Sequence, residues 1–225
     1  MLDDVRYIAI EGPIGAGKTS LAHALAERLG ARLVLEPADD NPFLEKFYAD
    51  MPAYALATQL AFLALRHRQQ TELARRDLSG PKVVSDYIVA RDKIFAGLTL
   101  DEEELGLYGR LYAAMAARAP KPDIVVLLEA DAETLMSRIY SRGTPYEDAL
   151  SRGYIERLVA EYDAYFRFYD ETPLLVIDTG LLGDYSEAGI DPDEVIGEIE
   201  QTGDGRRVYV PDRGQGSGGR GNGDI

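Results

Sequence analysis

The strongest constraint on the fold of this chain is a glycine-rich stretch near its start, at residues 7–20. A short apolar run, Tyr-Ile-Ala-Ile, leads into it, and periodic apolar residues over 21–29 predict a helix directly after it. The loop between them has the spacing of the motif that cradles phosphates between a strand and a helix, Gly12-x-x-x-x-Gly17-Lys18-Thr19. We therefore expect a nucleoside triphosphate to bind here.

Each residue type in this loop is suited to a part of binding a triphosphate and its metal ion. Glycine at positions 12, 15 and 17 permits backbone dihedrals that turn successive N–H groups toward an anion, and the helix start adds unpaired N–H groups. Lys18 can reach the outer phosphates, and the Thr19 hydroxyl is suited to hold Mg²⁺. The expected ATP-binding set is Gly12, Pro13, Ile14, Gly15, Ala16, Gly17, Lys18, Thr19 and Ser20.

Composition narrows the function classes. The chain has 225 residues, 46% of them hydrophobic, which suits one globular domain with a proper core. With no cysteine and two histidines, thiolate metal sites are excluded and a zinc site is disfavoured. A net charge of −15 argues against a nucleic acid polymer as partner.

No membrane or export segment is expected. The most apolar stretch, 53–65, is interrupted by Thr58 and Gln59. The first residues include Asp3, Asp4 and Arg6, which do not fit a secretory signal. These features favour a cytoplasmic protein.

Alternating apolar and amphipathic segments predict a doubly wound α/β fold with a five-stranded parallel sheet and helices on both faces. The expected strands cover 7–10, 32–35, 82–85, 124–128 and 174–177, and the expected helices cover 21–29, 53–75, 102–117, 132–142 and 153–169. Asp191-Pro192 predicts the start of a final short helix. We expect one domain over 1–201 and a glycine-rich, disordered tail over 202–225.

Ligands in such sheets bind beyond the carboxyl ends of the strands. Two expected strands end in carboxylates, Glu36 and Asp86, and either could orient an acceptor hydroxyl and take its proton. The sequence leaves open which is the base and which organises the metal. A local cationic cluster within this acidic chain is expected around Arg138 and Arg142.

The phosphate loop does not identify the acceptor of the phosphate. Three classes of protein fit it: a kinase for a small hydroxylated metabolite, a switch GTPase, and a nucleotide-binding subunit without chemistry. The guanine-reading Asn-Lys-x-Asp motif is absent, and Asp77-Leu78-Ser79-Gly80 precedes the third strand instead of following it, so the GTPase is disfavoured. Gln59 and Arg66 lie two helical turns apart and share one face. That face could bind the edge of a base, or it could be an ordinary helix surface.

Several motifs together resemble the deoxynucleoside kinase family, most closely its bacterial deoxyadenosine/deoxyguanosine kinase branch. The resemblance covers roughly residues 5 to 180. It rests on the phosphate loop, Leu35-Glu36-Pro37, Asn41-Pro42-Phe43-Leu44-Glu45-Lys46-Phe47-Tyr48, Gln59, Ser85-Asp86-Tyr87 with Asp92, and Arg138-Ile139-Tyr140-Ser141-Arg142-Gly143 with Glu147.

The resemblance implies a P-loop kinase fold with an arginine-containing lid around 138–152. It implies Glu36, Asp86 and Arg138 as the catalytic set, Thr19 and Asp86 as the residues near Mg²⁺, and Arg142 as a further contact to ATP. The implied substrate-binding set is Glu36 at the 5′-hydroxyl, Tyr48 and Glu147 at the sugar 3′-hydroxyl, Gln59 at the base, Arg66 with Asp92 at the base edge, and Tyr87.

Two departures from the family pattern concern charge. Tyr87 stands where an arginine usually follows the acidic residue, so Arg91 or Lys93 would have to supply that cation, and Thr144 replaces a third lid arginine.

The implied activity is transfer of phosphate from ATP, with Mg²⁺, to the 5′-hydroxyl of a small-molecule deoxynucleoside, with deoxyadenosine or deoxyguanosine expected. The alternatives are a pyrimidine deoxynucleoside or thymidylate kinase, or a weakly active subunit of a heterodimeric kinase; the family implies a homodimer or a heterodimer.

Overall fold

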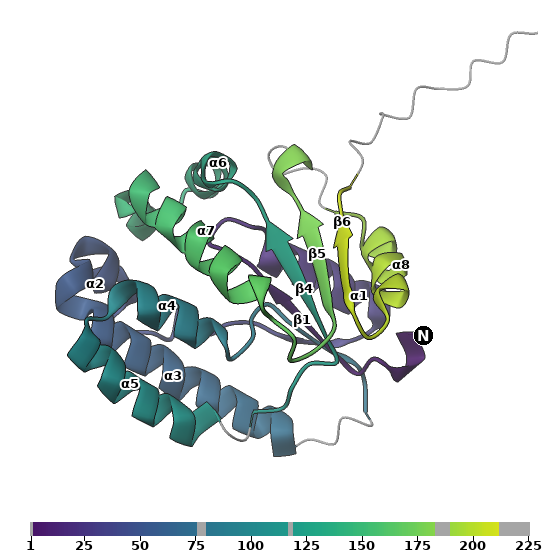
Figure 1. Cartoon of the computed structure of the whole chain (residues 1–225), viewed down its shortest axis with the longest axis horizontal. Coiled ribbons are helices and arrows are strands. Elements are labelled where there is room, and N and C mark those ends of the chain that lie inside the picture. The colour runs from purple at the N-terminus through teal and green to yellow at the C-terminus, as the bar shows by residue number, and fades with distance from the viewer. Residues whose placement is uncertain (1, 76–79, 117–118, 183–189, 212–225) are drawn as a thin grey trace, which may run out of the picture.

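The computed structural model contains a six-stranded, wholly parallel sheet with the order β2-β3-β1-β4-β5-β6 (Figure 1). It describes residues 2–75, 80–116, 119–182 and 190–211. The strands are β1 Tyr7–Glu11, β2 Arg32–Val34, β3 Val83–Ser85, β4 Ile124–Glu129, β5 Leu174–Asp178 and β6 Arg206–Tyr209. The predicted parallel α/β sheet is confirmed, but the expected number of five strands is wrong.

The missed strand is β6, which pairs with β5 from Leu174 opposite Arg206 to Ile177 opposite Tyr209. Its sequence, Arg-Arg-Val-Tyr, lacks the continuous apolar character of the central strands because it lies at the edge of the sheet and is half exposed. β6 falls within the segment 202–225 that was expected to be a tail. Residues 212–225 lie outside the described residues.

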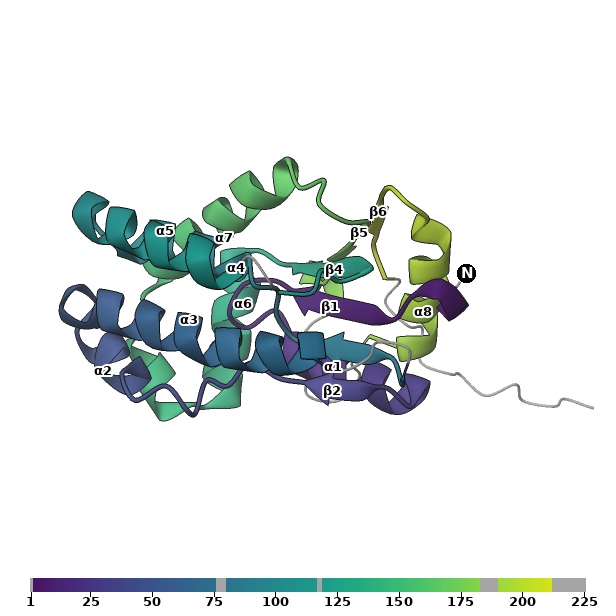
Figure 2. The same ribbon diagram turned by 90° about the horizontal axis from the view of Figure 1, so that it is seen from below.

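Helices form layers on both faces of the sheet (Figures 1 and 2). α1 and α8 contact each other on one face, while α4 and α7 contact each other on the other, with α3 and α5 beside α4. The bounds are α1 Lys18–Leu29, α2 Leu44–Ala49, α3 Met51–Arg75, α4 Arg91–Thr99, α5 Glu102–Ala116, α6 Ala132–Arg142, α7 Arg152–Arg167 and α8 Pro192–Thr202. The short helices α2 and α4 were not predicted.

Two apolar clusters fix these layers. The larger surrounds the sheet, where β1 and β4 are almost completely buried along their length. The smaller, which includes Phe47, Leu63, Ala96 and Tyr108, joins α2, α3, α4 and α5. Gln59 of α3 is four residues from both Ala55 and Leu63, so it lies on the same buried side of the helix as this cluster, and Arg66 shares that side.

The last helix of the described chain, α8, begins where the sequence predicts a helix start. The Asp191 side chain caps α8 by accepting a hydrogen bond from the Asp193 N–H at 2.9 Å, and Pro192 occupies the first helical position. Val195 and Ile199 are buried against the body, so the predicted final helix is confirmed.

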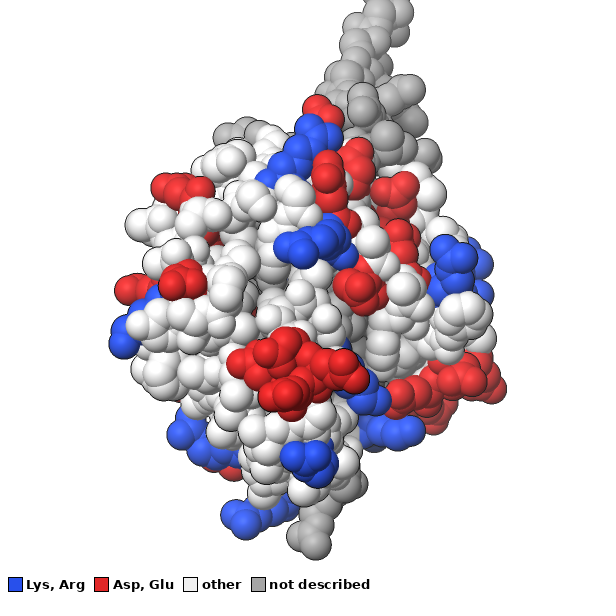
Figure 3. All heavy atoms as spheres, turned by 60° about the vertical axis from the view of Figure 1, so that its left-hand side comes forward, with Lys and Arg blue, Asp and Glu red and all other residues white. Residues whose placement is uncertain are grey.

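The described part of the chain contains no helix that is both long and apolar enough to span a bilayer. On the face shown in Figure 3, acidic and basic side chains are interspersed, with an acidic group near the centre. That face carries no continuous basic stripe of the kind that tracks a nucleic acid backbone.

Candidate active site

The glycine-rich loop between β1 and α1 adopts a conformation that only glycine tolerates. Gly12, Gly15 and Gly17 have φ angles of +150°, +85° and +94°. A Cβ on Gly12 would lie 2.5 Å from the Leu128 carbonyl oxygen, and one on Gly15 would lie 2.8 Å from that of Leu135. α1 then begins without a side-chain cap, so its first N–H groups remain available to an anion.

Two side chains at the start of α1 define the phosphate end of the site. Lys18 Nζ donates a hydrogen bond to the Pro13 carbonyl at 2.8 Å. Burial and the nearby Arg91 charge lower the pKa of Lys18 to about 7. Thr19 Oγ1 donates to Asp86 Oδ2 at 2.6 Å, while Ser20 is exposed on α1.

A cavity of about 240 Å³ connects this loop to α2, α3, α4 and the segment after α6. Its lining includes eleven of the residues expected from the sequence: Ile14, Gly15, Lys18, Thr19, Glu36, Tyr48, Gln59, Arg66, Asp86, Arg142 and Glu147. Residues that are up to 133 positions apart in the chain, from 14 to 147, thus meet in one place.

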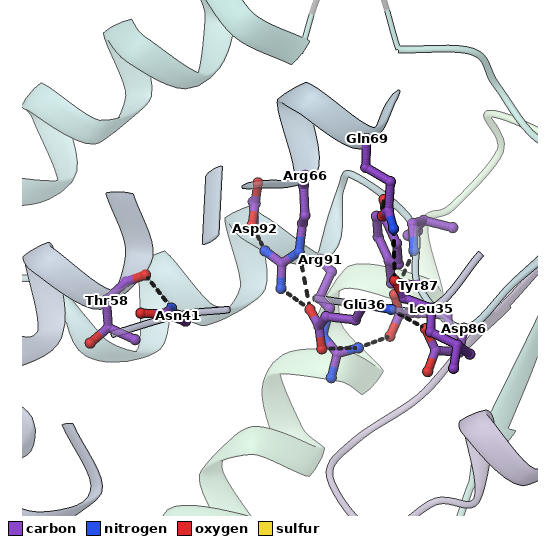
Figure 4. Close-up of polar contacts among 12 residues, drawn as sticks. Leu35, Glu36, Asn41, Thr58, Arg66, Gln69, Asp86, Tyr87, Arg91 and Asp92 are labelled. Carbon is purple, nitrogen blue, oxygen red and sulfur yellow. Dashed lines mark hydrogen bonds and ion pairs between the residues drawn. The ribbon is translucent and has the colours of Figure 1, made fainter. Parts of the chain in front are cut away.

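Glu36 follows β2 and lies between two arginines (Figure 4). Its Oε1 accepts from Arg66 Nε at 3.0 Å and also from Arg66 Nη2, while Arg91 Nη1 lies 3.4 Å from its Oε2. Burial alone would raise the pKa of Glu36, but the charges of Arg91 and Arg66 outweigh it and lower that pKa to about 2. Glu36 is therefore ionised at any physiological pH.

Asp86 follows β3 and has both oxygens engaged. Beside the bond from Thr19, its Oδ1 accepts from the Glu36 backbone N–H at 2.7 Å (Figure 4). A hydroxyl and a carboxylate side by side at the phosphate loop fit Mg²⁺, which takes one or two protein oxygens and completes its shell with water and substrate phosphates. Among the described residues no group of three or more His, Cys, Asp or Glu side chains is arranged to hold a metal ion.

The polar face predicted on α3 is buried and turned into the cavity. Gln59 is 2% exposed; its Nε2 donates to Thr99 Oγ1 at 3.3 Å, and its buried Oε1 has no hydrogen-bond donor among the described residues. The Arg66 guanidinium lies 4.7 Å from the centre of the Phe62 ring and pairs with both Asp92 and Glu36. An ordinary surface role for Gln59 and Arg66 is therefore excluded.

The segment after α6 closes the other wall. Glu147 accepts from Arg142 Nε at 3.1 Å and Nη2 at 2.7 Å. The neighbouring Tyr146 ring stacks on Tyr48, with centroids 5.4 Å apart and an interplanar angle of 15°. Tyr48 and Glu147, which are 99 positions apart in the chain, thereby meet at one wall of the cavity.

Eight of the expected site residues do not line the cavity: five belong to the loop and the start of α1 (Gly12, Pro13, Ala16, Gly17 and Ser20), and Arg138, Tyr87 and Asp92 lie elsewhere. Arg138 points toward the end of β5, where it donates to Thr179 Oγ1 at 2.9 Å and to the Thr179 carbonyl at 2.7 Å. Tyr87 is completely buried, and its hydroxyl bonds to two glutamines of α3, Gln69 and Gln70. Asp92 is behind Arg66 and contacts that guanidinium.

Arg91 of α4 supplies the cation that Tyr87 does not. It lines the cavity, is 4% exposed, and lies 3.7 Å from Glu11 as well as beside Glu36. Lys93, the other candidate, points elsewhere, 5.3 Å from the Tyr112 ring centre. Of the two replacements considered from the sequence, the structure selects Arg91.

Glu11 and Tyr154 were missed. Glu11 ends β1 fully buried and accepts hydrogen bonds from the Gly12 N–H at 2.9 Å, the Ile88 N–H at 3.0 Å and the Tyr162 hydroxyl at 2.9 Å. A lone acid at the end of an apolar strand was its only signal. Tyr154 of α7 lines the cavity but had no signal beyond its place in an amphipathic helix.

Comparison with known proteins identifies the family and the fold of the chain. The family model described as deoxynucleoside kinase matches residues 8–202. The chain is 36% identical over 158 residues to the deoxyguanosine kinase of Bacillus subtilis (70% of this chain, 76% of that protein) and 34% identical over 188 residues to the deoxyadenosine/deoxycytidine kinase of the same organism (79% and 85%). Its fold resembles that of the M. mycoides deoxyadenosine kinase with bound dATP, with a TM-score of 0.75 and 23% identity over 87% of this chain and 99% of the other.

Proposed function

The chain belongs to the deoxynucleoside kinase family, a family of phosphotransferases acting on a nucleoside hydroxyl, and we propose that it phosphorylates the 5′-hydroxyl of a purine deoxynucleoside with ATP as donor. The observation that carries this proposal is that Lys18, Glu36 and Gln59 line one cavity. A phosphate site, an acceptor site and a base site are then contiguous. The purine preference is supported by the relatives that are named deoxyguanosine and deoxyadenosine kinases.

On the donor side, the loop N–H groups and Lys18 hold the triphosphate. Burial and Arg91 lower the pKa of Lys18, and the negative charge of bound phosphates raises it again and restores the ammonium form. Thr19 and Asp86 hold Mg²⁺, which neutralises charge on the phosphates when bound. Arg142, at the end of α6, is near enough to the same cavity to add a further cation.

On the acceptor side, Glu36 orients the 5′-hydroxyl. A carboxylate with a pKa near 2 is a weak base but a permanently charged hydrogen-bond acceptor, so its main contribution is alignment of the nucleophile before proton loss. Asp86 contacts Thr19 beside the phosphate loop, so its position suits the metal better than the acceptor hydroxyl. We therefore assign the acceptor role to Glu36 and the metal role to Asp86.

The base binds against α3 and α4. Gln59 Oε1 is a buried acceptor without a donor, and leaving such an atom unpaired costs about 1–3 kcal/mol, so a ligand N–H that reaches it is favoured. The Phe62 and Phe95 rings also line the cavity and offer apolar surface to a planar base. Arg66, held by Asp92 and Glu36, presents a fixed cation beside that surface.

We further propose that the protein acts as a dimer, as expected for the family. On α5, the only buried side chain is Tyr108, while Leu105, Leu107 and Leu111 are each nearly 40% exposed (39%, 40% and 38%). Exposed leucines on one helix in this number support coverage of α5 by a second copy. Light scattering on the purified protein gives the mass, and kinase activity of a pure homodimer would exclude the need for a related partner kinase.

The test of the activity is a substrate panel. The purified protein is incubated with Mg²⁺ and ATP and with each of the four natural deoxynucleosides, and the 5′-monophosphate formed is quantified. We expect deoxyguanosine or deoxyadenosine to give the highest kcat/KM. Preference for thymidine or deoxycytidine would overturn the purine assignment, and phosphorylation only of a nucleoside monophosphate would overturn the acceptor assignment.

A further inference from the structure

The hydroxyl oxygen of Tyr154 in the cavity wall has no role in the proposed function. The hydroxyl of Tyr154, on α7, is buried and has no hydrogen-bond partner among the described residues, and the residue is 3% exposed. Tyr154 nevertheless lines the cavity that holds Lys18 and Gln59. A buried hydroxyl without a partner costs stability, so it is best explained by a ligand that supplies the missing bond.

The surroundings of this hydroxyl identify the part of the ligand that it meets. Tyr154 lines the cavity together with Tyr48, Tyr146 and Glu147, and after burial its electrostatic effect on the pKa of Tyr48 is the largest, followed by that of Glu147. These residues form the wall assigned to the sugar, whereas the base atoms face Gln59. Burial raises the pKa of the Tyr154 hydroxyl, so it remains protonated and can donate.

A sugar hydroxyl needs both a hydrogen-bond donor and an acceptor. The Glu147 carboxylate can only accept when it is ionised, and it already accepts from Arg142. The sugar oxygen has two lone pairs, so it can donate a hydrogen bond to Glu147 and accept from two phenols, that of Tyr48, already assigned to it, and the neutral phenol of Tyr154. We propose that Tyr154 is a further substrate-binding residue that donates a hydrogen bond to the 3′-hydroxyl of the deoxynucleoside, an inference that rests on the proposed function.

The experiment compares Tyr154→Phe with the wild type on two ligands, the preferred purine deoxynucleoside and its 2′,3′-dideoxy counterpart. Binding of each is measured by calorimetry, and kcat and KM are measured for the first. Tyr108→Phe is the matched control, because its hydroxyl is also buried without a partner but Tyr108 does not line the cavity. Both variants keep the ring and its packing.

We expect Tyr154→Phe to raise the KM and Kd for the deoxynucleoside about tenfold, the effect of one hydrogen bond of ordinary strength. The KM for ATP, the kcat, and the Kd for the dideoxynucleoside should each change less than about twofold, and Tyr108→Phe should match the wild type throughout. An equal loss for both ligands, or no loss for either, would overturn the role of Tyr154. If the wild type phosphorylates no deoxynucleoside at all, it is the proposed function that has failed.

Discussion

Replacement of Arg91 by glutamine tests how the acceptor site is held. In the wild type, Arg91 and Arg66 keep Glu36 ionised in a buried setting. We expect Arg91→Gln to lower kcat/KM for the deoxynucleoside about 100-fold at pH 7.5, since removal of one preorganised charge from a reacting centre typically costs that much. The effect should grow as the pH falls.

The magnitude follows from one distance and one pKa. Arg91 Nη1 lies 3.4 Å from Glu36 Oε2, where the attraction between unit charges at an effective dielectric constant near 20 is about 5 kcal/mol. The drop in the pKa of Glu36 from 4.5 to about 2 corresponds to a net effect of roughly 3 kcal/mol after the cost of burial. Both figures exceed the ~2.7 kcal/mol that a 100-fold loss requires.

The sign of the pH effect is fixed by the direction of the shift. A lowered pKa means that interactions of ionised Glu36 stabilise the fold and the site above pH ~4.3, and that they disappear as the pH falls toward 2. Without Arg91 the pKa rises back toward 4.5 or higher, so protonation of Glu36 begins within the measurable range. The ratio of variant to wild-type kcat/KM should therefore decrease between pH 7 and pH 5.

The assay measures formation of the 5′-monophosphate from pH 5 to 8. Circular dichroism checks that the variant is folded, because loss of a partner for Glu36 and Glu11 is expected to lower its free energy of unfolding by about 3 kcal/mol. Arg91→Lys keeps the charge and should recover part of the activity and the flat pH ratio. Lys93→Gln, two residues away on α4 and outside the cavity, is the matched control. The reasoning is refuted if folded Arg91→Gln stays within threefold of the wild type, or if Lys93→Gln is equally impaired.

Three further outcomes are expected. Gln59→Leu should raise the KM for the purine deoxynucleoside at least tenfold while the KM for ATP stays unchanged, as measured by steady-state kinetics; an equal rise in both would contradict a base-specific contact. Gly15→Ala should abolish ATP binding and lower the Tm, because the added Cβ meets Leu135 at a φ of +85°. Its control, Gly109→Ala, lies in open space on α5 and should raise the free energy of unfolding by about 1 kcal/mol. Calorimetric ATP titration and thermal unfolding measure both effects, and ATP binding by Gly15→Ala would refute the loop geometry. ATP binding should take up a proton above pH 7 and weaken as the pH rises further, since phosphates raise the low pKa of Lys18; calorimetry in buffers of different ionisation enthalpy measures this, and proton release would contradict it.

The parts of the fold that follow from sequence are those with strong periodicity or a fixed motif. β1, β4 and β5 are continuous apolar runs, and α6 ends at Arg142 before a left-handed Gly143, so both their type and their position were predictable. β6 was not predictable, because an edge strand gains its hydrogen bonds from a neighbour that is distant in sequence and needs little apolar burial of its own. α2 and α4 are too short for a periodic signal.

The candidate site divides in the same way. Lys18, Thr19 and Glu36 were predicted because loop spacing or a strand end marks them, whereas Gln59, a polar break in an apolar helix, was assigned to the base only through the family resemblance. Whether a long side chain reaches the cavity depends on packing that no local pattern encodes. Arg138 and Arg142 are four residues apart on one helix, yet the first bonds to Thr179 and the second lines the cavity.

The central claim is that one cavity holds a triphosphate at Lys18 and an uncharged nucleoside at Glu36 and Gln59. A crystal structure with a bisubstrate analogue, in which a purine deoxynucleoside is joined through its 5′-oxygen to a polyphosphate and adenosine, tests it most directly. The account predicts phosphate oxygens at the glycine loop and Lys18, the 5′-oxygen within hydrogen-bond distance of Glu36, and the base amide edge on Gln59. A nucleoside bound on any other surface, with Glu36 and Gln59 still engaged only by protein groups, would contradict it.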